Sequence, residues 1–94
     1  MDARIKKALI AKIQETISSA DEISKIQKML FHIPVSNHED FAFGIAVGRI
    51  YNSFHYQTRR ALKRNATEEE FLEFLDILAE RASVIKNALK QQQQ

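Results

Sequence analysis

The sequence predicts an all-α protein, a four-helix bundle with two shorter N-terminal helices and two long C-terminal helices. Apolar residues recur at spacings of three and four along most of the chain, as in amphipathic helices. The 94 residues include only two glycines and one proline, too few for the turns of a many-stranded sheet. We expect one helical domain over residues 1–90 and a disordered or frayed polyglutamine tail over residues 91–94.

The two N-terminal helices are predicted at Ala3–Ile17 and Ala20–His32. Asp2 suits the N-cap of the first helix. Pro34 ends the second, because the residue before a proline is pushed away from helical geometry. The apolar residues expected to face the core are Ile5, Leu9, Ile10, Ile13 and Ile17 in the first helix and Ile23, Ile26, Met29, Leu30 and Ile33 in the second.

The longest predicted helix is His38–Arg64. Ser36 is expected to cap it, in a capping box with Glu39, and Asn65 to end it in left-handed backbone geometry. On a helical wheel, the broad face expected to pack against the core contains Phe43, Val47, Ile50, Tyr51, Phe54, Thr58, Ala61 and Leu62.

The last helix is predicted to begin after Thr67, a good N-cap followed by three glutamates. Its apolar residues alternate at spacings of four and three, as in helical bundles. This seam consists of Phe71, Leu75, Leu78, Ala82, Ile85 and Leu89.

Further apolar residues lie outside these core faces and favour self-association, most simply as a two-fold dimer. Gly44 and Gly48 stand four residues apart, and each costs about 1 kcal/mol relative to alanine inside a helix. Close approach by another helix would explain that cost. The candidate self-association residues are Phe41, Gly44, Ile45, Gly48, Ile77 and Val84.

Charge is unevenly distributed, although the formal net charge is only +2. Residues 41–67 contain five basic residues and no acid, whereas residues 68–80 contain six acids and no base. Arginines interleaved with a tyrosine can hold phosphates while the ring stacks. The basic stripe, a candidate nucleic-acid or phosphate site, consists of Arg49, Tyr56, Arg59, Arg60, Lys63 and Arg64.

No metal or cofactor site is predicted. The acidic residues Glu69, Glu73, Asp76 and Glu80 line one stripe of the last helix, opposite its apolar seam. A di-iron bundle instead needs Glu-x-x-His motifs projecting into the core, and no such motif occurs. The three histidines lack metal-ligand spacing, and the absence of cysteine excludes disulfides and thiolate sites.

The segment Arg49-Ile50-Tyr51-Asn52-Ser53-Phe54-His55 is similar to the arginine–histidine signature of HEPN-type helical ribonucleases. The resemblance implies a dimer whose paired arginines and histidines cut RNA. The two side chains differ by about 120° around the helix, which separates them within one chain.

These observations favour a small non-enzymatic helical interaction protein that self-associates and can also bind a further, unidentified protein. A nucleic-acid-binding module that uses the basic stripe is the alternative, and a HEPN-like ribonuclease is the third reading. No apolar run reaches the length of a membrane span, and the N-terminus lacks the apolar segment of a signal peptide. We therefore expect a cytoplasmic protein with no membrane association.

Overall fold

A computed structural model describes residues 1–30 and 32–92 and contains four helices. They are α1 (Ala3–Ser18), α2 (Ala20–Met29), α3 (His38–Leu62) and α4 (Glu68–Gln91). No strand occurs among the described residues, so the all-α prediction is confirmed. None of the described helices combines the length and the apolar character needed to cross a lipid bilayer.

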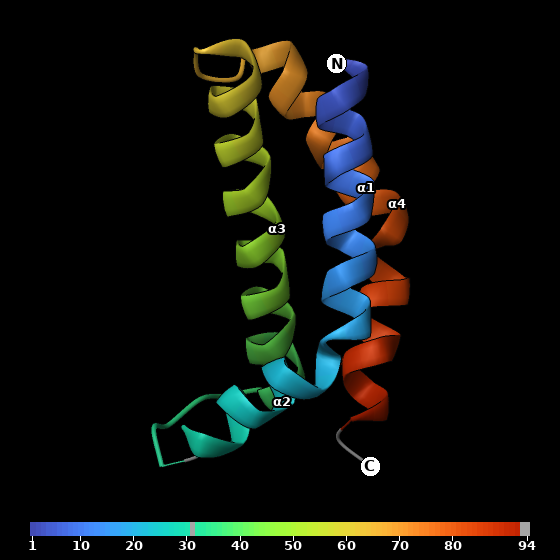
Figure 1. Ribbon diagram of the computed structural model, residues 1–94. Coiled ribbons are helices and arrows are strands. Elements are labelled where there is room, and N and C mark those ends of the chain that lie inside the picture. Colours follow the sequence, from blue (N-terminus) through green and yellow to red (C-terminus); the bar gives the residue numbers. More distant parts are fainter. Residues whose placement is uncertain (31, 93–94) are drawn as a thin grey trace.

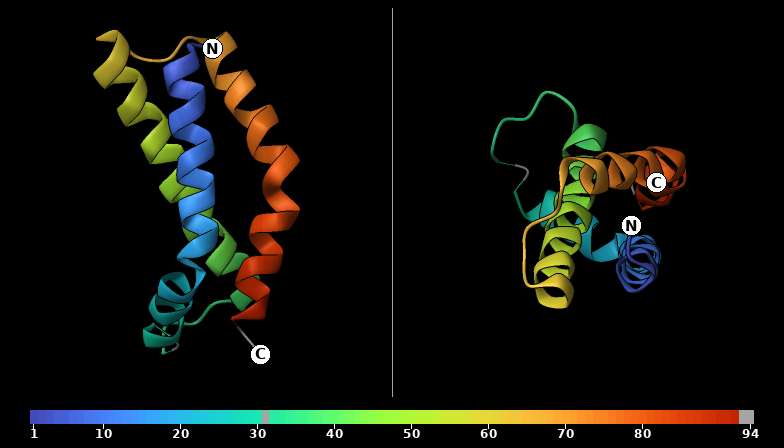
Figure 2. Two further views of the ribbon diagram at one scale, coloured as in Figure 1. Left: turned by 45° about the vertical axis from the view of Figure 1, so that its right-hand side comes forward. Right: turned by 90° about the horizontal axis from the view of Figure 1, so that it is seen from above.

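The helices α1, α3 and α4 run along the length of the molecule, and the short α2 lies across one end (Figures 1 and 2). α1 packs against both α3 and α4, and the short α2 lies at the end where α3 begins. The molecule is elongated, with principal extents of 41 × 22 × 18 Å. The predicted four-helix bundle is therefore confirmed in part, because α2 closes one end of a three-helix bundle instead of lying along it.

Small residues and aromatic rings hold α3 in the core. Ala42 and Ala46 are fully buried in its first half, and alanine side chains allow neighbouring helices to come close. In the second half, Phe54 stacks on Phe74 of α4 with ring centroids 4.5 Å apart. The buried apolar residues are Ile5, Leu9, Ile13, Ala20, Ile23, Ala42, Ala46, Ile50, Phe54, Phe74, Ile77, Ile85 and Leu89.

The predicted core faces of α3 and α4 are wrong in part, because both helices are rotated from the expected orientation. Phe43 and Val47 are only half-buried, and Tyr51 is 47% exposed. In α4, Leu75 is exposed whereas its neighbour Phe74 is buried. The prediction from the helical wheel placed the largest apolar residues toward the core, whereas the packing of the helices turns the alanine side of α3 inward.

Two of the predicted helix caps, Asp2 and Thr67, are confirmed. Asp2 accepts a hydrogen bond from the Arg4 N–H at 2.8 Å. Thr67 and Glu70 form a reciprocal capping box at the start of α4. α4 then continues to Gln91, one residue past the predicted end of the domain, and residues 93–94 of the predicted tail lie outside the described residues.

Other predicted ends are wrong. Asn37, not Ser36, caps α3 by accepting from the Asp40 N–H at 2.9 Å. α2 ends at Met29 instead of His32, since Lys28 and Met29 at its end are exposed and gain little from packing. At the other end of α3, Lys63 takes the left-handed conformation expected of Asn65, with φ 59°. The chain therefore leaves α3 two residues early.

Candidate functional site

The side of α3 opposite its fully buried residues carries no charge over its first two thirds. This glycine face consists of residues within about 120° of one another on the helical wheel. Between Phe41 and Gln57 the only Lys, Arg, Asp or Glu is Arg49, and Arg49 turns toward α1. The glycine face consists of Phe41, Gly44, Ile45, Gly48, Tyr51, Asn52 and His55.

The two glycines open this face to another helix. Both are exposed, and a Cβ added at Gly44 or Gly48 would meet no atom within 4 Å. Packing inside the chain therefore does not require glycine at either position. The helix is weakened by both residues without any compensating contact in the monomer.

Aromatic rings border the glycine face on the side of α4. The Tyr51 ring meets the His55 ring edge-on, with centroids 4.6 Å apart. His55 in turn lies over Phe71 of α4 at 5.9 Å, with the rings inclined by 25°. These contacts hold Tyr51 in place although 47% of it is exposed. The border of the face is thus a fixed aromatic surface.

The α4 part of the predicted self-association set does not join this face. Ile77 is 8% exposed and belongs to the core, so the prediction that it lies outside the main seam is wrong. Val84 is 55% exposed. It lies eleven residues after Glu73 and hence on the same side of α4. Glu73 contacts Met1 beside α1, so this side is not the one that meets α3.

Two of the five cations in the basic stripe, Arg49 and Arg64, form ion pairs with carboxylates. Arg49 lies 3.0 Å from Glu15 Oε1 and 4.0 Å from Glu22 Oε1. Arg64 forms two hydrogen bonds with the Glu70 carboxylate, of 2.7 and 3.2 Å. Both arginines therefore have local structural roles, as expected if part of the stripe neutralises nearby acids.

The rest of the stripe forms a polar, positively charged surface at the C-terminal end of α3. Tyr56 is 52% exposed, and Arg59 and Arg60 follow it at i+3 and i+4, on one side of the helix. None of the ion pairs within the described residues involves Arg59, Arg60 or Lys63. We call Tyr56, Arg59, Arg60 and Lys63 the open basic surface.

A shallow hollow lies at each end of the open basic surface. One lies at the helix end and is lined by Arg59, Lys63, Arg64 and Asn65. The other lies between α1 and α3, and its lining residues are Lys12, Arg49, Asn52, Ser53, Tyr56 and Gln57. The second hollow offers hydroxyl and amide groups as well as positive charge. Tyr56 belongs to both this hollow and the open basic surface.

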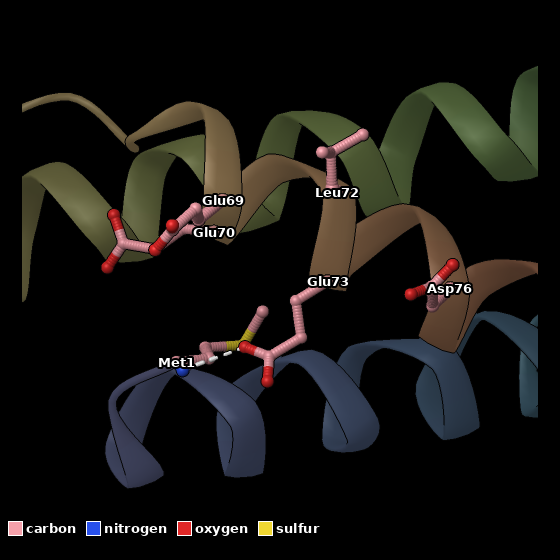
Figure 3. A pocket seen from close by; sticks show the side chains of 6 residues that line it. All are labelled: Met1, Glu69, Glu70, Leu72, Glu73 and Asp76. Carbon is pink, nitrogen blue, oxygen red and sulfur yellow. Dashed lines mark ion pairs between the residues drawn. The ribbon is translucent and has the colours of Figure 1, made fainter.

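A third hollow is acidic and lies where α1 begins (Figure 3). The Met1 ammonium group lies 2.8 Å from Glu73 Oε2, and their hydrogen bond raises the pKa of the ammonium group. Leu72 points away from this contact, and Asp76 lies about one turn further along α4 (Figure 3). Among the described residues no cluster of three or more His, Cys, Asp or Glu side chains could hold a metal ion.

The two residues of the ribonuclease-like segment are not brought together within the chain. Arg49 points toward the carboxylates of α1 and α2. His55 packs against Tyr51, Phe54 and Phe71 on the side of α4. The described residues of one chain therefore contain no arginine–histidine pair at this position that could act on a phosphate.

Sequence reasoning missed Tyr51, Asn52 and His55 as members of the glycine face. The signal that identifies them is the run from Phe41 to Thr58, in which Arg49 is the one charged residue. A helix that meets water along one side normally carries charge there. Comparisons with known protein families, with curated proteins and with solved structures found no match to this chain.

Proposed function

We propose that this chain is a helical interaction protein that self-associates through the glycine face of α3. The observation that carries the proposal is the combination of an uncharged, partly exposed helix face with two exposed glycines that no neighbour requires. Close approach of a second helix would compensate for the helix propensity lost at Gly44 and Gly48. A two-fold dimer is the simplest arrangement, because one self-complementary face then serves both partners.

The shape of the chain supports an additional contact surface. Its accessible surface is 6119 Å², whereas a compact monomer of this mass exposes about 5,600 Å². Its radius of gyration is 14.2 Å, compared with about 12.4 Å for a compact domain of this length. A standard interface removes about 800 Å² from each partner. An elongated chain can supply that area along α3.

The residues of the face suit a tight contact between helices. Glycines let backbones approach closely, and Tyr51 beside them offers a large ring of the type enriched at the centres of interfaces. Asn52 can form a hydrogen bond across the two-fold axis without bringing charge into the contact. No like charges would be forced together when two copies of this face meet.

Replacing both glycines by alanine tests this proposal by separating stability from association. In the monomer, Gly44→Ala and Gly48→Ala meet no atom, so each stabilises α3 by about 1 kcal/mol. In the dimer, the added methyl groups lie between the helices, so association weakens at least tenfold. Ser83→Ala, on the exposed side of α4, is the control, since it raises helix propensity and leaves association unchanged. Unchanged association of the double alanine variant would contradict the proposal.

The open basic surface supports a second function, binding to nucleic acid. Three cations without a carboxylate partner within the described residues lie next to an exposed tyrosine. Cations in the last turn of a helix also stabilise its negative end. That role would explain Arg59 and Arg60 without any ligand.

Salt dependence distinguishes the two roles of these cations. If they contact phosphates, replacing Arg59 and Arg60 by alanine weakens binding to DNA and RNA and lowers the salt slope by about one unit for each lost contact. Arg4→Ala is the control, since Arg4 is paired with Asp2. If wild-type protein shows no binding at low salt, the cations serve only the helix end.

A further inference from the structure

We infer that the open basic surface holds single-stranded nucleic acid, with one base stacked on Tyr56 and the backbone phosphates beside Arg59, Arg60 and Lys63. This inference rests on the second function proposed above and specifies its ligand. It assigns separate roles to the ring and to the cations. The assignment follows from their order along α3 and from the hollow on the other side of Tyr56.

The positions of the side chains define the binding path. From Tyr56 to Lys63 the helix rises about 10 Å, and Arg59 and Arg60 lie between them on the same side as the ring. Each of these four residues is exposed. An extended strand lying along this path passes a ring first and then three positive charges.

The hollow between α1 and α3 continues the path beyond Tyr56. Ser53 and Gln57, which lie outside the glycine face, line it together with Lys12. Their amide and hydroxyl groups can donate to and accept from base edges or sugar hydroxyls. A second nucleotide on this side of the ring would meet polar groups instead of an apolar wall.

A single strand fits this surface better than a duplex. Stacking on Tyr56 requires a base whose face is free, which duplex bases lack. The open basic surface is also short and carries only three cations, none of which has an ion-pair partner in the part of the chain that the structure describes. Stacking would therefore contribute a large part of the affinity, at about 1–3 kcal/mol per base.

The backbone at Lys63 is consistent with a role for this helix end. Lys63 is the one residue other than glycine with positive φ among the described residues. Lysine has no advantage in left-handed geometry, where glycine or asparagine costs less. The turn places three basic residues around one hollow, together with Asn65.

Tyrosine fluorescence provides a direct test, because the chain contains two tyrosines and no tryptophan. In Tyr51→Phe, Tyr56 is the sole tyrosine and reports contact with a base. We expect titration with a single-stranded oligouridylate to quench its fluorescence, while a duplex of equal phosphate content leaves it nearly unchanged. In Tyr56→Phe, where Tyr51 is the sole tyrosine, we expect no quenching. Quenching of Tyr51 instead of Tyr56 would contradict the inference.

Affinity measurements separate failure of this inference from failure of the second function. Tyr56→Leu should lower the affinity for the single strand about tenfold or more and leave duplex binding unchanged. An unchanged single-strand affinity in Tyr56→Leu, with loss of binding in Arg59→Ala/Arg60→Ala, would overturn the stacking role alone. If wild-type protein binds neither ligand, both proposals fail. A DNA strand of the same length tests whether the 2′-hydroxyl contributes.

Discussion

Arg64 and Glu70 join the end of α3 to the first turn of α4. Two guanidinium nitrogens of Arg64 donate to the two carboxylate oxygens of Glu70, at 2.7 and 3.2 Å. The Thr67 N–H also donates to Glu70 Oε1, at 2.8 Å. Glu70 therefore completes the capping box of α4 and fixes the direction of the turn. These hydrogen bonds, that from Arg64 foremost, lower the pKa of Glu70 to about 2.

This relationship predicts how acid affects stability. Because the pKa of Glu70 is lower in the folded protein than its ordinary value of 4.5, its contribution to stability is complete above about pH 4.5. The contribution is lost as the pH falls toward about 2. We expect the thermal midpoint of wild-type protein to fall more steeply over this range than that of Glu70→Gln. Glu69→Gln, in the same turn, is the control and should retain the wild-type slope.

The cap of α3 gives a second prediction. The Asn37 side chain accepts from the Asp40 N–H, so Asn37→Ala should lower the free energy of unfolding by about 1 kcal/mol. Ser36→Ala should change it little, because Ser36 is exposed and does not cap the helix. Denaturant titration of both variants checks the assignment. A larger loss for Ser36→Ala would show that the sequence-based prediction of the cap was right.

Packing of the alanine side of α3 gives a third prediction. Ala46 is completely buried, so Ala46→Leu should destabilise the protein by about 1–3 kcal/mol through overpacking. Ala79→Leu, on the exposed side of α4, should have a small effect. Denaturant titration of both variants measures the difference. Equal effects would mean that the helices do not meet at Ala46.

Local signals predicted much of the fold. The caps at Asp2 and Thr67 depend on a few neighbouring residues, so the sequence identified them. The rotation of α3 depends on which helices surround it. A wheel cannot show that the alanines pack more closely than Phe43 and Val47 do. The early end of α2 has a similar cause, since contacts with other elements decide how far a short helix extends.

The candidate surfaces were predicted in part. Phe41, Gly44, Ile45 and Gly48 share one side of a single helix, and helical periodicity alone places them together. The burial of Ile77 could not be predicted in this way, because it depends on how α4 is rotated in the bundle. In the basic stripe, Arg49 donates a hydrogen bond to Glu15, which lies 34 residues away in the sequence. Contacts of that range are set by the packing of helices, so spacing along α3 does not indicate which cations are paired.

Self-association through the glycine face is the central claim, and sedimentation equilibrium tests it most directly. Ile45 packs against the core, so a charge there would also destabilise the fold. Gly48→Glu instead places the charge on an exposed position and is the better variant.

At high micromolar concentration we expect wild-type protein to sediment as a dimer, with twice the chain mass of 10.9 kDa. Gly48→Glu should sediment near 10.9 kDa and remain helical by circular dichroism. Wild-type protein that stays at 10.9 kDa at the same concentration would contradict the claim.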